Sequence, residues 1–207
     1  EAALALAKTE FPETDPIFAF IEDDRATCLL RQGKPDRALE ASSKALMAAK
    51  LSVLPNSAEM GSLLSNQAVM LAAVGKFQDS ASAGESALKL VRSTLGESHP
   101  LSISAARNLA VTYIELDNAA AAVTTLNEAI DATNTSAPSD SKTLVTLYLA
   151  KASALAKMEE AAAARETAQL ALQKGASKEA ELNAEATVVL ARAAINESKL
   201  EEAESLL

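Results

Sequence analysis

A 42-residue period is the feature of this sequence that most limits its fold. The dipeptide Ala-Leu or Ala-Ile begins at five positions that follow one another at this spacing: Ala3, Ala45, Ala87, Ala129 and Ala171. Two further series of small residues keep the same step: Ala26, Ala68, Ala110 and Ala152, and then Ala38, Ser80, Ala122 and Ala164. Ala is abundant here, so one series could reflect composition, but three series with one period are hard to explain in that way. The period indicates an array of structural repeats.

The pattern of apolar residues within each repeat predicts two amphipathic helices. In the third repeat, apolar residues at steps of three and four predict a helix from Pro100 to Leu116 and a second one over 119–132, separated by Asp117 and Asn118. The other pairs are expected near 16–32 and 35–50, 57–74 and 77–94, and 140–157 and 160–174; a fifth begins near 178, and 1–9 resembles the second helix of a preceding repeat. The segment SKLEEA (198–203) aligns with GKFQDS (75–80). This alignment predicts that the step from the fourth repeat to the fifth is 39 residues, shorter than the other steps.

The recurring small residues predict how the helices pack. A methyl group where two antiparallel helices cross lets their backbones come close, while Leu or Tyr three residues further on fills the space beside the crossing. Gly33 and Gly75 lie between paired helices, where a residue with positive φ is needed. One pair cannot bury its apolar face alone, so the repeats must stack. The sequence predicts an all-α solenoid.

The segments NLAVTYIELDNAAAAVTTLNEAI (108–130) and NQAVMLAAVGKFQDSASAGESAL (66–88) resemble tetratricopeptide repeats. The period and the linker LGESHP (95–100) resemble the kinesin-light-chain type. The resemblance implies a right-handed superhelical array of antiparallel helix pairs over residues 1–207, with repeats at 14–50, 57–94, 99–133 and 140–174 and a partial one at 178–207. The chain is expected to be part of a longer protein. It departs from the pattern at Ser80, at Asp117 and Glu159 in the turns, and at Glu22 and Arg25 on the inward face.

Composition argues against several classes of function. The net charge of −9 disfavours binding to nucleic acid and to anionic membranes. The longest stretch without charge, 60–75, contains Ser and Asn and is too short and polar to insert in a bilayer. A single cysteine excludes an internal disulfide and fits an intracellular location, in the cytoplasm or inside an organelle whose targeting segment is missing here.

Residues for catalysis are scarce, so the sequence predicts neither an enzyme, nor a metal site, nor a cofactor. His99 is the only histidine and is expected to cap or pack within the linker. Cys28 has no accompanying motif and is expected to pack inside a helix pair. Met60 and Met70 are expected to fill the core. No glycine-rich phosphate loop is present.

The remaining candidate is a groove lined by the first helices. Asn66 and Asn108 occupy equivalent positions one period apart, and the resemblance implies that they bond the backbone of a bound peptide. An amide both donates and accepts, so it can bind an extended chain of any sequence. Asp24 holds the position of the two asparagines in the first repeat. Arg107, directly before Asn108, could meet a carboxylate. The polar stretch from Thr133 to Ser141 is interpreted as a flexible connector, with a binding loop as the alternative.

Three functions are compatible with this pattern. The first is a non-enzymatic scaffold that binds a protein or peptide in the concave groove through Asn66, Arg107, Asn108 and Asp24. The second is a permanent subunit of a multi-protein complex, in contact through the convex face or the ends. The third is the targeting part of a longer enzyme.

Overall fold

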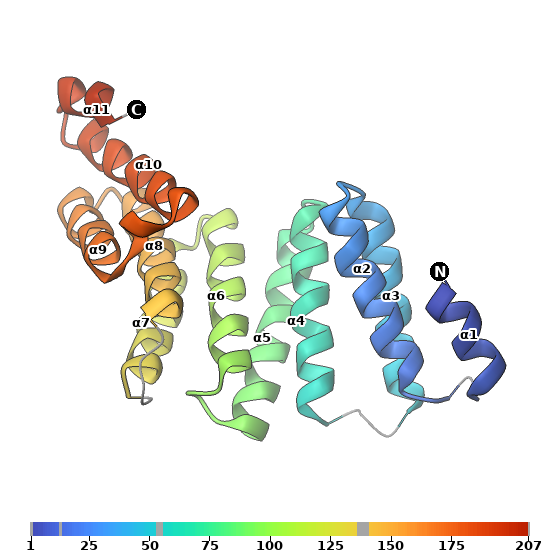
Figure 1. The fold of residues 1–207 in the computed structure, drawn as a ribbon. Helices are drawn as coiled ribbons and strands as arrows, with labels where there is room; N and C mark the ends of the chain where they lie inside the picture. The colour runs from blue at the N-terminus through green and yellow to red at the C-terminus, as the bar shows by residue number, and fades with distance from the viewer. Residues whose placement is uncertain (1, 13, 53–55, 136–140, 207) are drawn as a thin grey trace. The chain divides into compact units, whose positions relative to one another are not determined.

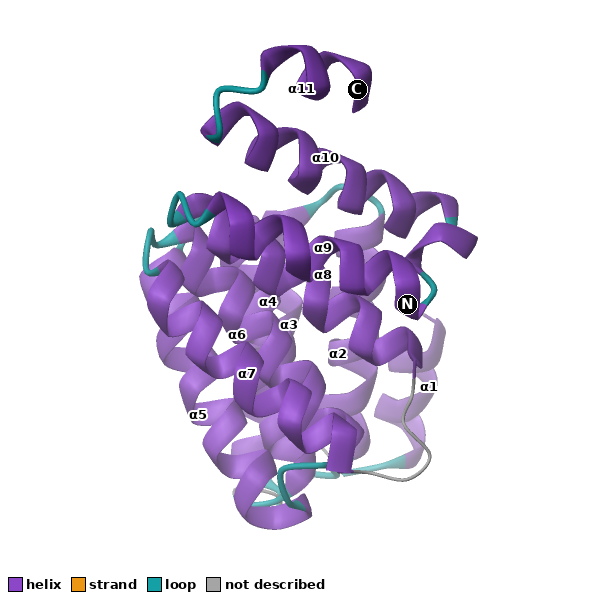
Figure 2. Cartoon of the chain, turned by 90° about the vertical axis from the view of Figure 1, so that its left-hand side faces the viewer, coloured by secondary structure: helices purple, strands orange, loops and turns teal. Residues whose placement is uncertain are grey.

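The fold is made of helices. The computed structural model describes residues 2–12, 14–52, 56–135 and 141–206. Over these ranges the chain consists of α-helices, turns and one 3-10 turn, and contains no strand. Figure 2 accordingly shows helix and loop as the kinds of segment in the described chain. The predicted all-α class is confirmed.

Helices follow one another in pairs after the short helix α1 (Ala2–Glu10), as the order of colours in Figure 1 shows. In each pair a tight turn joins a first helix to a second. The pairs are α2 (Ile17–Arg31) and α3 (Pro35–Leu51), α4 (Ala58–Ala73) and α5 (Phe77–Leu95), α6 (Pro100–Glu115) and α7 (Ala119–Thr135), α8 (Ser141–Lys157) and α9 (Ala161–Lys174), and, after a 3-10 turn (Ala176–Lys178), α10 (Ala180–Asn196) and α11 (Leu200–Leu206).

The predicted connector at 133–141 is partly wrong. Residues 133–135 are the last turn of α7, where the buried Thr133 hydroxyl donates a hydrogen bond to the Ala129 carbonyl, and Ser141 begins α8. Because this hydrogen bond satisfies the Thr133 hydroxyl within the helix, α7 continues into the polar stretch and does not end before Thr133. Residues 136–140 lie outside the described part of the chain.

The helices form two compact units, Glu1–Thr112 and Tyr113–Leu207. The first, called unit 1 below, contains α1 to α5 and most of α6. The second, called unit 2, contains the end of α6 and the helices from α7 to α11.

The turns within the pairs show the period in the backbone. A residue with φ between 58° and 77° occurs five times, at Gly33, Gly75, Asp117, Glu159 and Ser198. The first four follow the 42-residue period, and the last comes after a 39-residue step, so the predicted shorter step is confirmed. At each turn the following N–H donates to a carbonyl five residues earlier, from Lys34 to Leu29, for example, which closes the helix end. Three of these turns adopt the left-handed conformation without glycine.

The small positions are buried, as predicted. The residues of both series, Ala26, Ala68, Ala110 and Ala152, and Ala38, Ser80, Ala122 and Ala164, are all at most 3% exposed. In unit 1, two helical glycines bring helices closer still. A Cβ atom at Gly61 would lie 2.6 Å from Val91 Cγ1, and one at Gly84 would lie 3.0 Å from Leu109 Cδ1. Close approach of helix backbones therefore builds the unit 1 core, which also buries the predicted core residues Met60 and Met70.

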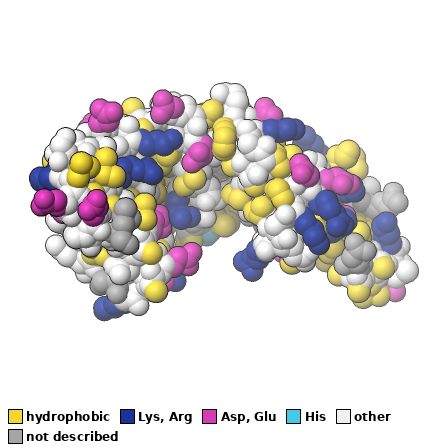
Figure 3. All heavy atoms as spheres, turned by 90° about the horizontal axis from the view of Figure 1, so that it is seen from above, with side chains coloured by type: hydrophobic (Ala, Val, Ile, Leu, Met, Phe, Trp, Pro, Cys, Tyr) yellow, Lys and Arg dark blue, Asp and Glu magenta, His cyan; other side chains and the backbone are white. Residues whose placement is uncertain are grey.

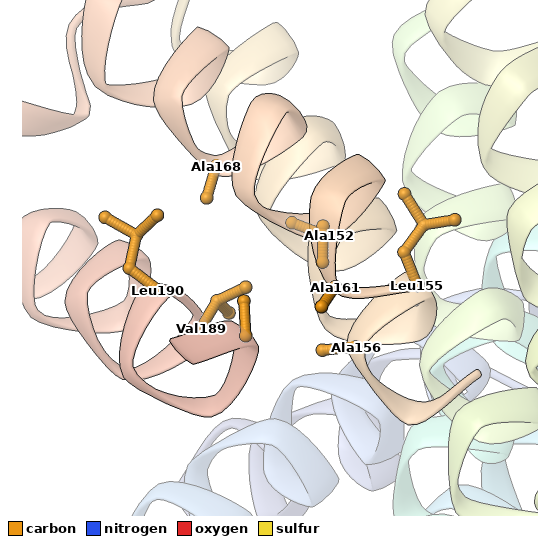
Figure 4. Close-up of a cluster of buried hydrophobic side chains, with 9 residues drawn as sticks. Ala152, Leu155, Ala156, Ala161, Ala168, Val189 and Leu190 are labelled. Carbon is orange, nitrogen blue, oxygen red and sulfur yellow. The ribbon is translucent and has the colours of Figure 1, made fainter. Parts of the chain in front are cut away.

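Unit 2 is packed mainly with alanine. One of its clusters joins three successive helices, as Figure 4 shows. The cluster consists of Ala152, Leu155 and Ala156 from α8, Ala161, Ala164 and Ala168 from α9, and Val189, Leu190 and Ala193 from α10. A second cluster contains Leu149 and Val145 of α8 together with Ala186 of α10. Helix α10 therefore covers α8 as well as α9.

Candidate functional site

The candidate residues occupy two adjacent positions on the first helices of unit 1. The first position holds Asp23 in α2, Ser65 in α4 and Arg107 in α6, and the second holds Asp24, Asn66 and Asn108. Asp24 is exposed, and the other five side chains are half-buried. These six residues are called the unit 1 polar face below. Half-burial suits a site where polar groups are partly desolvated but open to a ligand.

Asn66 is held by a neighbouring repeat. Its Nδ2 donates a hydrogen bond of 2.7 Å to Oδ2 of Asp23. An ionised carboxylate only accepts, so the amide nitrogen must face Asp23 and the amide oxygen must face away from it. The two residues are 43 apart in sequence. This separation is one 42-residue period plus one residue. The sequence analysis compared residues separated by whole periods and so missed the pair.

The Asp23 carboxylate lies in an unfavourable environment. Burial raises its pKa above the ordinary value of 3.8; the hydrogen bond from Asn66 works against this rise, and the nearby Asp24 charge adds to it. Its Oδ1 atom is buried and has no hydrogen-bond partner among the described residues. A buried carboxylate with a single donor normally costs stability.

Arg107 and Asn108 have side-chain groups that the fold itself does not use. The Arg107 Nε is buried without a partner, and the structure gives this guanidinium no hydrogen bond or ion pair within the described ranges. The Asn108 side chain has no hydrogen-bond partner among the described residues, while the backbone carbonyl of Asn108 accepts a hydrogen bond of 3.3 Å from the Thr112 hydroxyl. The chain has 28 acidic and 19 basic residues, so an unpaired arginine is notable in it. Arg107 and Asn108 can therefore bind a ligand without breaking a native contact.

Asp24 lines a pocket of about 420 Å³. The pocket is lined by α1, α2 and the start of α3, and its rim includes Arg25, Lys34 and Arg37. Glu22, predicted on the inward face, is buried and forms an ion pair of 3.1 Å with Arg25. In Figure 3, which shows the side chains from above, both signs of charge occur among the spheres.

The prediction for Cys28 is wrong, because the thiol is exposed and lines this pocket. The equivalent positions in later repeats, Met70, Thr112 and Ala154, are buried.

The described part of the chain offers no cluster of side chains for a metal ion. No group of three His, Cys, Asp or Glu side chains in these ranges could hold a metal ion. His99 caps α6, as expected, because its Nδ1 accepts a hydrogen bond of 3.2 Å from the Leu101 N–H. Among the described helices, none combines the length and the apolar character needed to cross a membrane.

The fold defines a helical-repeat protein, and comparisons with known proteins show which repeats it resembles. Residues 59–135 match the family model described as tetratricopeptide repeat. A search of curated protein sequences finds no significant match. Residues 59–135 are therefore tetratricopeptide repeats, and the chain has a fold similar to that of kinesin-light-chain TPR-like repeats.

Solved structures support the fold assignment over the whole chain. The kinesin-light-chain TPR-like repeats of Podosopora anserina match with a TM-score of 0.77 and 17% identity, over 93% of this chain and 92% of that one. BtubC (BKLC) from P. vanneervenii matches with a TM-score of 0.76 and 17% identity, over 100% and 83%. A Rap protein solved in complex with competence and sporulation factor has a TM-score of 0.77 and 12% identity, and the match covers 98% of this chain but 55% of that one. At these identities the comparisons establish the fold alone.

Proposed function

We propose that the chain is a non-enzymatic scaffold that binds an extended peptide segment of a protein partner along the unit 1 polar face. Solenoids of tetratricopeptide repeats are protein-interaction scaffolds, so a general protein-binding role follows from the family. The finer proposal assigns the contacts to Asn66, Arg107 and Asn108, with Asp24 at the margin of the site.

The observation that carries the proposal is the unused hydrogen-bonding capacity of α6. Arg107 and Asn108 are half-buried, and within the described residues their side chains have no partner. One repeat earlier, Asn66 still has its oxygen and one N–H after donating to Asp23. Two amides in equivalent positions of successive repeats can each bond a backbone group of one extended peptide.

The test begins with a random-sequence peptide library displayed on phage and selected on the purified chain. The affinity of a selected peptide is then measured by fluorescence anisotropy for Asn108→Ala, Asn66→Ala and the double variant. Each substitution is expected to weaken binding by roughly 1–2 kcal/mol, about 5- to 30-fold, because each removes a hydrogen bond from a partly desolvated groove. Asn127→Ala is the matched control, since Asn127 is an exposed residue of α7. Unchanged affinity in the double variant contradicts the proposal.

A second candidate function, a permanent subunit of a larger complex, is favoured by apolar side chains at the surface of unit 2. Val188 and Ile195 of α10 are each 50% exposed, and Leu200 at the start of α11 is 63% exposed. Val188 and Ile195 are seven residues apart and so lie on one side of the helix. Hydrogen exchange of the chain isolated from its source, in the presence and absence of the co-purifying partner, separates the two functions: protection confined to α10 and α11 favours the second.

A further inference from the structure

We infer that Asp23 is a positioning residue for ligand binding, and this inference rests on the proposed function. It fixes the Asn66 amide so that the free carbonyl oxygen receives a backbone N–H of the bound peptide. This arrangement selects a peptide whose residue over α4 has a free backbone N–H. Proline lacks this N–H and is therefore excluded at that position.

The orientation follows from the chemistry of the pair. The bond from Asn66 Nδ2 to Asp23 Oδ2 is 2.7 Å long, which is short for an N–H donor and typical of a charged acceptor. Turning the amide over would place its oxygen against the carboxylate, where two acceptors would repel each other. Asn66 therefore has one orientation, with Oδ1 on the side away from α2.

The second amide of the face is not held in this way. Ser65 stands in the same sequence relation to Asn108 as Asp23 does to Asn66, since each precedes its asparagine by 43 residues. A hydroxyl both donates and accepts, so it tolerates either orientation of a nearby amide. The Asn108 amide can therefore turn to donate or to accept a hydrogen bond, whereas the Asn66 amide is held so that its oxygen accepts one from the peptide.

Stability gives no reason for a carboxylate at position 23. One oxygen of Asp23 accepts a single hydrogen bond, and the other is buried without a partner among the described residues. Removal of the carboxylate relieves the unpaired buried oxygen but leaves the half-buried Asn66 N–H without its acceptor, so the two effects on folding oppose each other. Its effect on the orientation of Asn66 provides a role that does not depend on stability.

The experiment uses the full chain and the peptide selected in the display experiment. A set of peptides is synthesised in which each backbone N–H in turn is replaced by N-methyl. For the native chain, one position is expected to lose about 5-fold in affinity, the value of one neutral hydrogen bond, and Asn66→Ala is expected to abolish this penalty. In Asp23→Ala, Asn66 can rotate and present its NH2 group instead, so the penalty at that position should fall to less than twofold.

Two controls separate this inference from structural effects and from the proposed function. Asp36→Ala removes an exposed acidic residue from the first turn of α3 and should leave the N-methyl penalty unchanged. The thermal midpoint of Asp23→Ala should stay close to that of the native chain, because the loss of the Asn66 hydrogen bond and the relief of the unpaired Asp23 oxygen oppose each other. An N-methyl penalty that is the same in Asp23→Ala as in the native chain overturns the inference while peptide binding stands. Binding that is indifferent to both Asn66→Ala and Asn108→Ala overturns the proposed function itself.

Discussion

The same two positions have opposite environments in the two units. In unit 1 they hold Arg107 and Asn108, which are half-buried and polar, whereas in unit 2 they hold Leu149 and Ala150, which are buried and apolar. Helix α10 explains the unit 2 environment, because its residue Ala186 packs in one cluster with Leu149 of α8. One repeat pattern can therefore provide either an open polar face or a closed core, depending on what covers the first helix.

The units also differ in how they use polar groups between repeats. In unit 2, Lys157 Nζ donates 2.7 Å to the Ile114 carbonyl, and Asn196 Nδ2 donates 3.1 Å to the Ala156 carbonyl, so each satisfies a carbonyl near the end of the preceding first helix. Arg165 of α9 also forms ion pairs with Glu197 and Glu202. These groups are occupied within unit 2. In unit 1, by contrast, Arg107 and Asn108 remain available, which is why we place binding there.

The largest effect that tests this comparison is expected from core truncation. Leu149→Ala in unit 2 and Leu63→Ala in unit 1 should each cost about 2–5 kcal/mol of unfolding free energy. Leu149 should cost more, because the other buried members of its cluster are Val145 and alanines, whose short side chains cannot fill a cavity. The Leu63 cluster, by contrast, buries the flexible side chain of Met60. Urea unfolding followed by circular dichroism measures both. A larger loss at Leu63 would contradict the proposed difference in packing.

Glycine in the unit 1 helices should be the next most sensitive feature. Gly61→Ala places a methyl group 2.6 Å from Val91 Cγ1. Overpacking costs about 1–3 kcal/mol, and the gain in helix propensity returns up to about 1 kcal/mol, so a net loss of about 1–2 kcal/mol is expected in urea unfolding. Gly84→Ala is the matched control, since its nearest contact is the flexible end of Leu109 at 3.0 Å, and it should lose less.

A smaller effect is expected where serine replaces alanine in the packing series. The buried Ser80 hydroxyl donates 2.7 Å to the Ala68 carbonyl and lies 2.9 Å from the Thr112 hydroxyl. Ser80→Ala should cost about 1 kcal/mol, because it removes this link and leaves a buried threonine hydroxyl underused. Thr112→Val in the same chain should recover most of the loss, since neither partner then remains. If the double variant loses the sum of two single effects, Ser80 and Thr112 are not coupled.

The smallest effect is an opposite response of the two units to acid. Asp23 has a raised pKa, so its contribution stabilises the folded state as pH falls from neutral toward 3.8. Hydrogen bonds from Lys199 and then Arg165 lower the pKa of Glu197 below 4.5, so its contribution is present above that value and is lost as pH falls through the lowered pKa. Urea midpoints between pH 7 and 3.5 should therefore fall more steeply in Asp23→Asn than in the native chain, and less steeply in Glu197→Gln. The same slope in all three proteins would exclude both contributions.

The sequence was sufficient to predict the helix pairs and their spacing. The 42-residue series located the buried small residues, and the alignment of charged residues after Ser198 gave the shorter last step that the φ angles show. Both follow from local chemistry, since a turn needs a residue with positive φ and a helix crossing needs a small side chain. The same period located the equivalent positions of Asn66 and Asn108, although their role in binding is a proposal.

Tertiary structure decided how the side chains meet across repeats. Asp23 holds Asn66, Cys28 is open to solvent, and Leu149 is covered by α10, and the period alone indicated none of these. The physical reason is that a period gives each residue's position within its own repeat but not the offset at which one repeat stacks on the next. That offset is set by packing along the whole helix pair, and it determines which polar groups are satisfied inside the fold and which remain for a partner.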